Sequence, residues 1–176
     1  MELINNTTKT LRDDLSSEIK KGSKLSIAAA CFSIYAFQEL KKQLKDIEEL
    51  RFIFTSPAFI REKPQKEKRE FYIPRLNRER SLYGTEFEVK LRNELNQKAI
   101  AKECAEWIRK KVTFKSNITD ESMMGFINVD DKNYMPVNGF TTVDLGCERG
   151  NYAYNMVQKA EVRFSLAYLQ HFEQLW

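Results

Sequence analysis

The chain has 176 residues, of which 31% are charged, and a formal net charge of +4 at pH 7. This length corresponds to one domain that can bury its own core without cross-links. The polar start Met1–Thr10 argues against a signal peptide, and the longest apolar stretch, 25–37, contains serines and is shorter than the roughly 20 residues of a membrane span, so we expect a soluble, cytoplasmic protein.

The first third of the chain predicts two parallel strands connected by a helix. The apolar run LSIAAACF is nearly continuous, which is typical of a strand buried on both faces. The order helix, strand, helix, strand indicates a right-handed crossover between parallel strands. The expected elements are a helix from Thr7 or Thr8 to Gly22, a strand over 25–32, a helix capped by Ser33, and a strand over 50–55.

A long loop is expected over 57–83, because this stretch contains Pro64 and Pro74 and alternating charges. The stretch 61–80 contains eight basic and four acidic residues. Lysine and arginine near phosphates release counterions, and Phe71 or Tyr72 could stack on a base; a solvated charged loop is the alternative. The predicted nucleic-acid-binding residues are Arg61, Lys63, Lys66, Lys68, Arg69, Arg75, Arg78 and Arg80.

The remainder of the chain predicts a long helix, a hairpin and a closing helix. Thr85 and Glu88 form a capping box for the long helix, which carries Cys104 and Trp107 on its apolar face. The expected elements are a helix over 85–111, strands over 112–115, 123–129 and 134–137, a turn over 130–133, a strand over 151–157, and a helix over 159–176. The closing helix is expected to bury the face formed by Val162, Leu166, Leu169 and Trp176.

Four segments resemble the phospholipase D-like domain found at the N-terminus of bacterial superfamily II helicases. The segments are LRDDLSSEIKKGSKLSIAAACFSIYAFQELKKQL, ELNQKAIAKECAEWIRKKVTFKS, NGFTTVDLG and HFEQLW. The resemblance implies an α/β fold in which a mixed β-sheet is sandwiched between helices, forming a single phospholipase D-like domain over 1–176. It also implies that the chain is part of a longer helicase-type protein, whose remaining domains bind and hydrolyse ATP.

The residues that the family uses for catalysis are missing from this sequence. Family members carry an H-x-K motif and then a Gly-Ser-x-Asn-Phe-Thr-like turn, and a neutral histidine attacks phosphorus while cations stabilise the transition state. Here the corresponding strand is MMGFI, which offers neither a nucleophile nor a cation. The turn keeps Phe140 and Thr141 but has lost its serine, and its asparagine is displaced to Asn138. The degenerate active-site segment comprises Met124, Phe126, Asn138 and Thr141.

Other catalytic or metal-binding arrangements have weaker support. His171 is the only histidine and is expected to lie off the apolar face of the last helix, pointing to solvent or to a partner. The pairs Asp13-Asp14, Asp130-Asp131 and Glu48-Glu49 are expected at exposed positions. Asp13, Asp14, Asp120 and Glu121 have no spacing that singles out a metal. The three separated cysteines form no C-x-x-C pair and are expected to be buried free thiols.

The sequence therefore predicts a catalytically inactive binding module without a cofactor or metal. Its expected partners are nucleic acid, DNA more than RNA, a second copy in a homodimer, and the C-terminal helicase domains of the same chain. Met123, Met124, Tyr152 and Tyr154 could belong to a dimer or peptide surface, although such residues are more often core. An active phosphodiesterase or nuclease with a non-standard site is the alternative, and a purely structural dimerisation unit is a third hypothesis.

Overall fold

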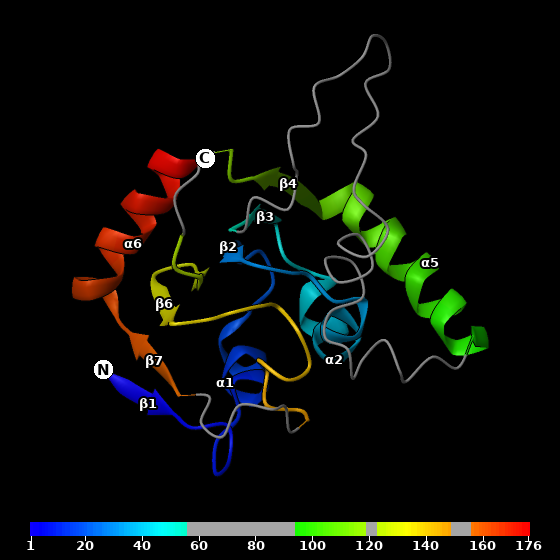
Figure 1. Cartoon of the computed structure of the whole chain (residues 1–176), viewed down its shortest axis with the longest axis horizontal. Helices are drawn as coiled ribbons and strands as arrows, with labels where there is room; N and C mark the ends of the chain where they lie inside the picture. The colour runs from blue at the N-terminus through cyan, green and yellow to red at the C-terminus, as the bar shows by residue number, and fades with distance from the viewer. Residues whose placement is uncertain (56–93, 119–122, 149–155) are drawn as a thin grey trace, which may run out of the picture.

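The computed structural model describes residues 1–55, 94–118, 123–148 and 156–176 (Figure 1). The described residues form a mixed α/β structure around a seven-stranded sheet with the order β1-β7-β6-β5-β2-β3-β4. The strands are β1 (Glu2–Ile4), β2 (Lys24–Ala29), β3 (Glu49–Phe54), β4 (Val112–Ser116), β5 (Phe126–Val129), β6 (Lys132–Met135) and β7 (Val157–Ala160). The helices are α1 (Leu11–Glu18), α2 (Ile34–Leu44), α5 (Glu94–Lys111) and α6 (Val162–Leu175).

The parallel half of the sheet confirms the predicted crossover. β2 pairs in parallel with β3, and β3 pairs in parallel with β4. Ser33 caps α2 as predicted, and its hydroxyl accepts the backbone N–H groups of Tyr35 and Ala36. The five residues of β2 from Leu25 onward are buried, as expected for a strand covered on both faces. The beginning of the predicted helix over 85–111, with its capping box, lies outside the described residues.

The antiparallel half contains the predicted hairpin, with a shorter turn than expected. β5 pairs with β6 so that Val129 lies opposite Lys132, which leaves Asp130 and Asp131 as a two-residue turn. Asp130 has a φ of +50°, a conformation that aspartate tolerates better than most residues. Its carboxylate accepts hydrogen bonds from the Ser23 hydroxyl (2.6 Å) and the Lys24 N–H (2.8 Å). These contacts fix the hairpin to the start of β2.

Helices cover the two faces of the sheet unequally. α1, α2 and α5 pack on one face and enclose the larger core, which includes Leu15, Leu40 and Trp107. Among the described helices, only α6 lies on the opposite face (Figure 1), and its Phe172 contacts a small cluster formed by Ala28, Ile53 and Phe126. Within the described residues, the apolar cluster beneath α6 is therefore the smaller of the two.

Several predicted boundaries are wrong at the chain ends. α1 begins after Thr10, whose hydroxyl accepts the Asp13 N–H. Thr7 and Thr8 instead donate their backbone N–H groups to the Asn5 side chain. The helix also ends at Glu18, before the predicted end at Gly22.

The closing segment differs from its prediction in two respects. Lys159 and Ala160, predicted as helix, belong to β7, while 149–155 lie outside the described residues. On α6 the buried residues include Ser165 and Phe172, whereas Leu166 is exposed. The helix is thus rotated relative to the predicted face. Among the described residues, no helix is long and apolar enough to cross a membrane.

Candidate functional site

The candidate site lies at the sheet edge where β2, β3 and β4 end, next to the start of β5. Ligands of open α/β sheets bind at the carboxyl ends of parallel strands where the strand order reverses, and β2 is flanked here by β3 on one side and β5 on the other. The exit segment, defined as residues 136–146, crosses this edge. It contains the Asn138 and Thr141 positions of the degenerate motif.

Backbone hydrogen bonds fix the exit segment to the end of β2. The N–H of Ala30 donates to the carbonyl of Asn138 (2.8 Å). The N–H of Phe140 donates to Cys31, and the N–H of Ser33 donates to Phe140 (2.8 and 2.9 Å). The backbone N–H of Ser33, the N-cap of α2, and the carbonyl of Cys31 are therefore hydrogen-bonded to Phe140 of the exit segment.

The retained Phe140 and Thr141 stabilise the exit segment. Phe140 is buried and stacks on Phe32, with the ring centroids 5.6 Å apart. Thr141 is fully buried, and its hydroxyl donates to Asp144 Oδ2 (2.5 Å) while it accepts the Asp144 N–H (3.1 Å). A side chain at Gly139 would meet Cys31 Sγ and Asp144 Oδ2 within 2.8 Å. Thr141 thus has a structural role, and Asn138 is exposed.

Met124 and Phe126, which the resemblance aligns with the histidine and lysine of the family motif, are apolar. Met124 is 61% exposed, whereas Phe126 is 2% exposed and packs against Phe172 of α6. A Cβ at Gly125 would lie 1.9 Å from the Val137 carbonyl oxygen, so the backbone leaves no space for a side chain between these two residues. This strand therefore presents neither a nucleophile nor a cation.

His171 does not replace the missing nucleophile. It is exposed, as predicted, and its ring centroid lies 6.2 Å from that of Phe126. Within the described parts of the chain, no hydrogen-bond or ion-pair partner orients its imidazole, as general base catalysis would require.

A buried charge network between α1 and the antiparallel strands was missed from the sequence. Asp14, predicted to be exposed, is only 2% exposed. Its carboxylate accepts hydrogen bonds from the Tyr134 hydroxyl (2.7 Å) and pairs with Lys159 (2.8 Å) and Lys9 (2.5 Å). Lys159 also pairs with Glu18 (2.8 Å). The helical spacing could have revealed the burial of Asp14, but not its partners, because Asp14 shares one face with Leu11, Leu15 and Glu18.

In this network the lysine charges compensate the carboxylate charges, as expected of a structural role. Burial alone would raise the pKa of Asp14, but the hydrogen bonds from Lys159, Lys9 and Tyr134 outweigh it and lower that pKa. Burial and the neighbouring Asp14 carboxylate raise the pKa of Tyr134. Hydrogen bonds from Lys132 and Lys159 lower the pKa of Glu18. These groups compensate one another and leave no acid or base poised for catalysis.

The four acidic residues weighed as possible metal ligands, Asp13, Asp14, Asp120 and Glu121, are only partly described by the structure. Asp13 is exposed and pairs with Arg12, while Asp14 faces the lysines. Asp120 and Glu121 lie outside the described residues. Across the described ranges, no group of three His, Cys, Asp or Glu side chains could hold a metal ion.

The three cysteines are free thiols in different environments. Cys104 is buried in α5, whereas Cys31 and Cys147 are half-buried. Burial raises the pKa of the Cys104 thiol to about 12, so it remains protonated and unreactive at neutral pH. Burial also raises the pKa of Cys147 to about 12. The expectation of buried thiols is thus confirmed fully only for Cys104.

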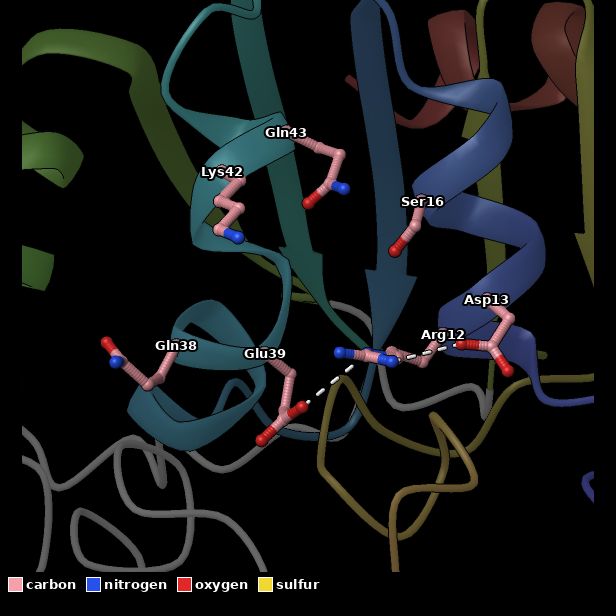
Figure 2. Close-up of a pocket in the computed structure, with 7 residues that line it drawn as sticks. All are labelled: Arg12, Asp13, Ser16, Gln38, Glu39, Lys42 and Gln43. Carbon is pink, nitrogen blue, oxygen red and sulfur yellow. Dashed lines mark hydrogen bonds and ion pairs between the residues drawn. The ribbon is translucent and has the colours of Figure 1, made fainter.

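A polar groove of about 400 Å³ separates α1 from α2 (Figure 2). Figure 2 shows Arg12 between two carboxylates, those of Asp13 and Glu39. Arg12 Nη1 lies 3.0 Å from Asp13, and its Nε lies 3.5 Å from Glu39. These two carboxylates compensate the guanidinium charge, so the groove offers no free arginine to an anionic ligand.

The fold and its sheet edge define a mixed α/β protein whose candidate site is closed by apolar and backbone groups. The eight basic residues predicted to bind nucleic acid, within 61–80, lie outside the described residues. In comparisons with known proteins, neither a family model nor a curated sequence matches the chain.

Proposed function

We propose that the chain is a phospholipase D-like domain that has lost its phosphoryl-transfer chemistry and serves a helicase-type protein in binding DNA. The observation that carries this proposal is the packing at the motif positions. Phe126 fills the space beneath α6, and Gly125 abuts the Val137 backbone. A nuclease of this type needs a nucleophile and cations at these positions.

The connectivity of the chain supports a role for the basic segment. Thr55, the last described residue before it, directly follows β3 at the candidate edge. The segment 61–80, rich in lysine and arginine, therefore follows in the chain from the end of β3 at this edge. Lysine and arginine side chains bind phosphates without cleaving them.

We expect the protein to bind DNA with a marked dependence on salt and to leave it intact. Fluorescence anisotropy with single- and double-stranded oligonucleotides across a salt series measures this. In the triple variant Lys66→Gln, Lys68→Gln, Arg69→Gln, the slope of log affinity against log salt should fall by about 0.9 for each lost contact to duplex phosphate. A matched triple variant at Lys20, Lys21 and Arg163 should keep the wild-type slope.

Two outcomes would contradict this proposal. Binding that is absent at low salt, or that shows no salt slope, would exclude a phosphate-directed role. Cleavage of plasmid or oligonucleotide that disappears in His171→Ala would favour the alternative of an active nuclease with a non-standard site.

Self-association is a second candidate function, favoured by the exposed apolar residues on the α6 side. Phe164 and Leu166 are 61% and 52% exposed, and 164–172 contains no Asp, Glu, Lys or Arg in a chain that is 31% charged. Exposed apolar side chains are typical of protein contacts, and a run of sequence without charged side chains lets two identical copies meet along it without repulsion.

If two copies associate through the run 164–172 of α6, Phe164→Glu should convert dimers to monomers in sedimentation velocity. The loss of apolar contact and the introduced like charges both act in this direction. Met124→Glu is the matched control, because Met124 is equally exposed but lies at the start of β5. Dissociation by Met124→Glu alone would place the contact at the hairpin instead, and a wild-type monomer at all concentrations would exclude both.

A further inference from the structure

A second groove, between α2 and α5, carries a concentration of lysines. It has a volume of about 370 Å³ and lies on the larger-core face of the sheet. Four lysines line it together with two glutamates and two aromatic residues. The lining residues are Phe37, Lys41, Lys45, Glu103, Glu106, Trp107, Lys110 and Lys111.

The floor of this groove is fixed by packing and hydrogen bonds. The rings of Phe37 and Trp107 have centroids 4.8 Å apart, and Trp107 Nε1 donates to the carbonyl of Leu44 (2.8 Å). Lys111 Nζ donates to the carbonyl of Ile47 (2.8 Å). These bonds join the C-terminal ends of α2 and α5, so the lysines at both ends are held close together.

The charges along the groove do not cancel. Lys41 pairs with Glu103, which leaves Lys45, Lys110 and Lys111 against Glu106. Within the described ranges, neither Lys45 nor Lys110 has an ion-pair partner. Lysine near a helix C-terminus compensates the helix dipole, which is about half a charge at each end, so the three lysines exceed Glu106 and the two helix ends together. The excess positive charge is available to an anionic ligand.

We propose that this groove binds phosphates of a nucleic-acid backbone, as a second contact surface in addition to the segment 61–80. The inference rests on the proposed DNA-binding function. Phe37 and Trp107 are almost completely buried, so neither ring is exposed to stack on a peptide side chain, and the lysines without ion-pair partners in the described ranges carry the preference for phosphate. Flexible ammonium groups act as point charges toward phosphate oxygens and need no fixed bidentate geometry.

The test compares Lys45→Gln, Lys110→Gln with a control double variant, Lys21→Gln, Arg163→Gln, whose residues do not line the groove. Both remove two positive charges from exposed side chains. With a duplex oligonucleotide in a salt-series anisotropy titration, the groove variant should lose about 1.8 from the slope of log affinity against log salt, equivalent to two phosphate contacts. The control variant should keep the wild-type slope, and both variants should keep the wild-type melting temperature.

The outcomes separate this inference from the proposed function. If the wild type binds DNA and the groove variant shows the same slope, only the groove assignment is wrong. If the wild type does not bind DNA at low salt, the proposed function and the groove assignment both fail. Direct binding of poly-glutamate that needs Lys45 and Lys110, without DNA binding, would assign the groove to an acidic protein partner and overturn the inference.

Discussion

Replacing Asp14 with alanine is expected to lower the free energy of unfolding by about 3–5 kcal/mol, a typical cost of removing one partner from a buried ion pair. The variant leaves the Lys159 ammonium, whose side chain is 7% exposed, without its most buried partner. It also removes the acceptor of the Tyr134 hydroxyl. Chemical denaturation at pH 7, monitored by circular dichroism, measures the loss.

The neighbouring Asp13 provides a matched control. Its carboxylate is exposed and interacts with Thr10 and the adjacent Arg12, and such exposed interactions contribute about 1 kcal/mol or less. Asp13→Ala should therefore unfold close to the wild type. Equal effects of the two substitutions would show that the Asp14 pairs contribute little.

The pH dependence provides an independent check on the same network. The pKa values of Asp14 and Glu18 are lowered in the folded state. Their stabilisation is therefore present above the ordinary carboxyl pKa of about 4 and is lost as the pH falls through the lower folded-state values. The stability difference between wild type and Asp14→Ala should shrink in this acidic range. A difference that stays constant down to pH 2 would contradict the assignment.

The network explains how the antiparallel half of the sheet is held to α1. Asp14 and Glu18 come from α1, Tyr134 from β6 and Lys159 from β7. β7 has only four residues, and short strands contribute little pairing energy on their own. We infer that the charge network stabilises this region where apolar packing is limited.

The parts of the fold that could be predicted are those with local signals. The run beginning at Leu25 and the Ser33 cap depend on nearby residues alone, and both were located within a few positions. β1 was not predicted, and Lys159 was placed in a helix, because three- and four-residue strands are defined by pairing. Glu2 lies opposite Lys159 across 157 positions of sequence, and no local pattern contains that information.

The candidate site could be predicted in part. The sequence located the degenerate motif, but it could not show that Gly125 contacts the Val137 backbone or that Phe126 lies under α6. The Asp14 network was missed because charged residues near a helix start are usually solvated. Its recognition needed β6 and β7 in place, since the partners Tyr134 and Lys159 are more than a hundred residues away.

Restoring the motif residues tests whether the site has lost only its side chains. The variant Met124→His, Phe126→Lys places a histidine and a lysine at the two positions of the degenerate motif. Phe126 is 2% exposed among Ala28, Ile53 and Phe172. Truncating a buried phenylalanine costs about 3–5 kcal/mol, and an unpaired ammonium in the same place adds a desolvation cost.

We therefore expect the double variant to lose at least about 3 kcal/mol of stability and to leave plasmid DNA uncut. Met124→His alone is the control, because Met124 is exposed and its replacement should change stability by less than about 0.5 kcal/mol. Thermal denaturation and a plasmid-nicking assay measure the two effects. A double variant that is as stable as the wild type and cuts DNA would show that the scaffold still accommodates catalysis. Loss of stability without cleavage would mean that the packing of Phe126 beneath α6 has closed the site.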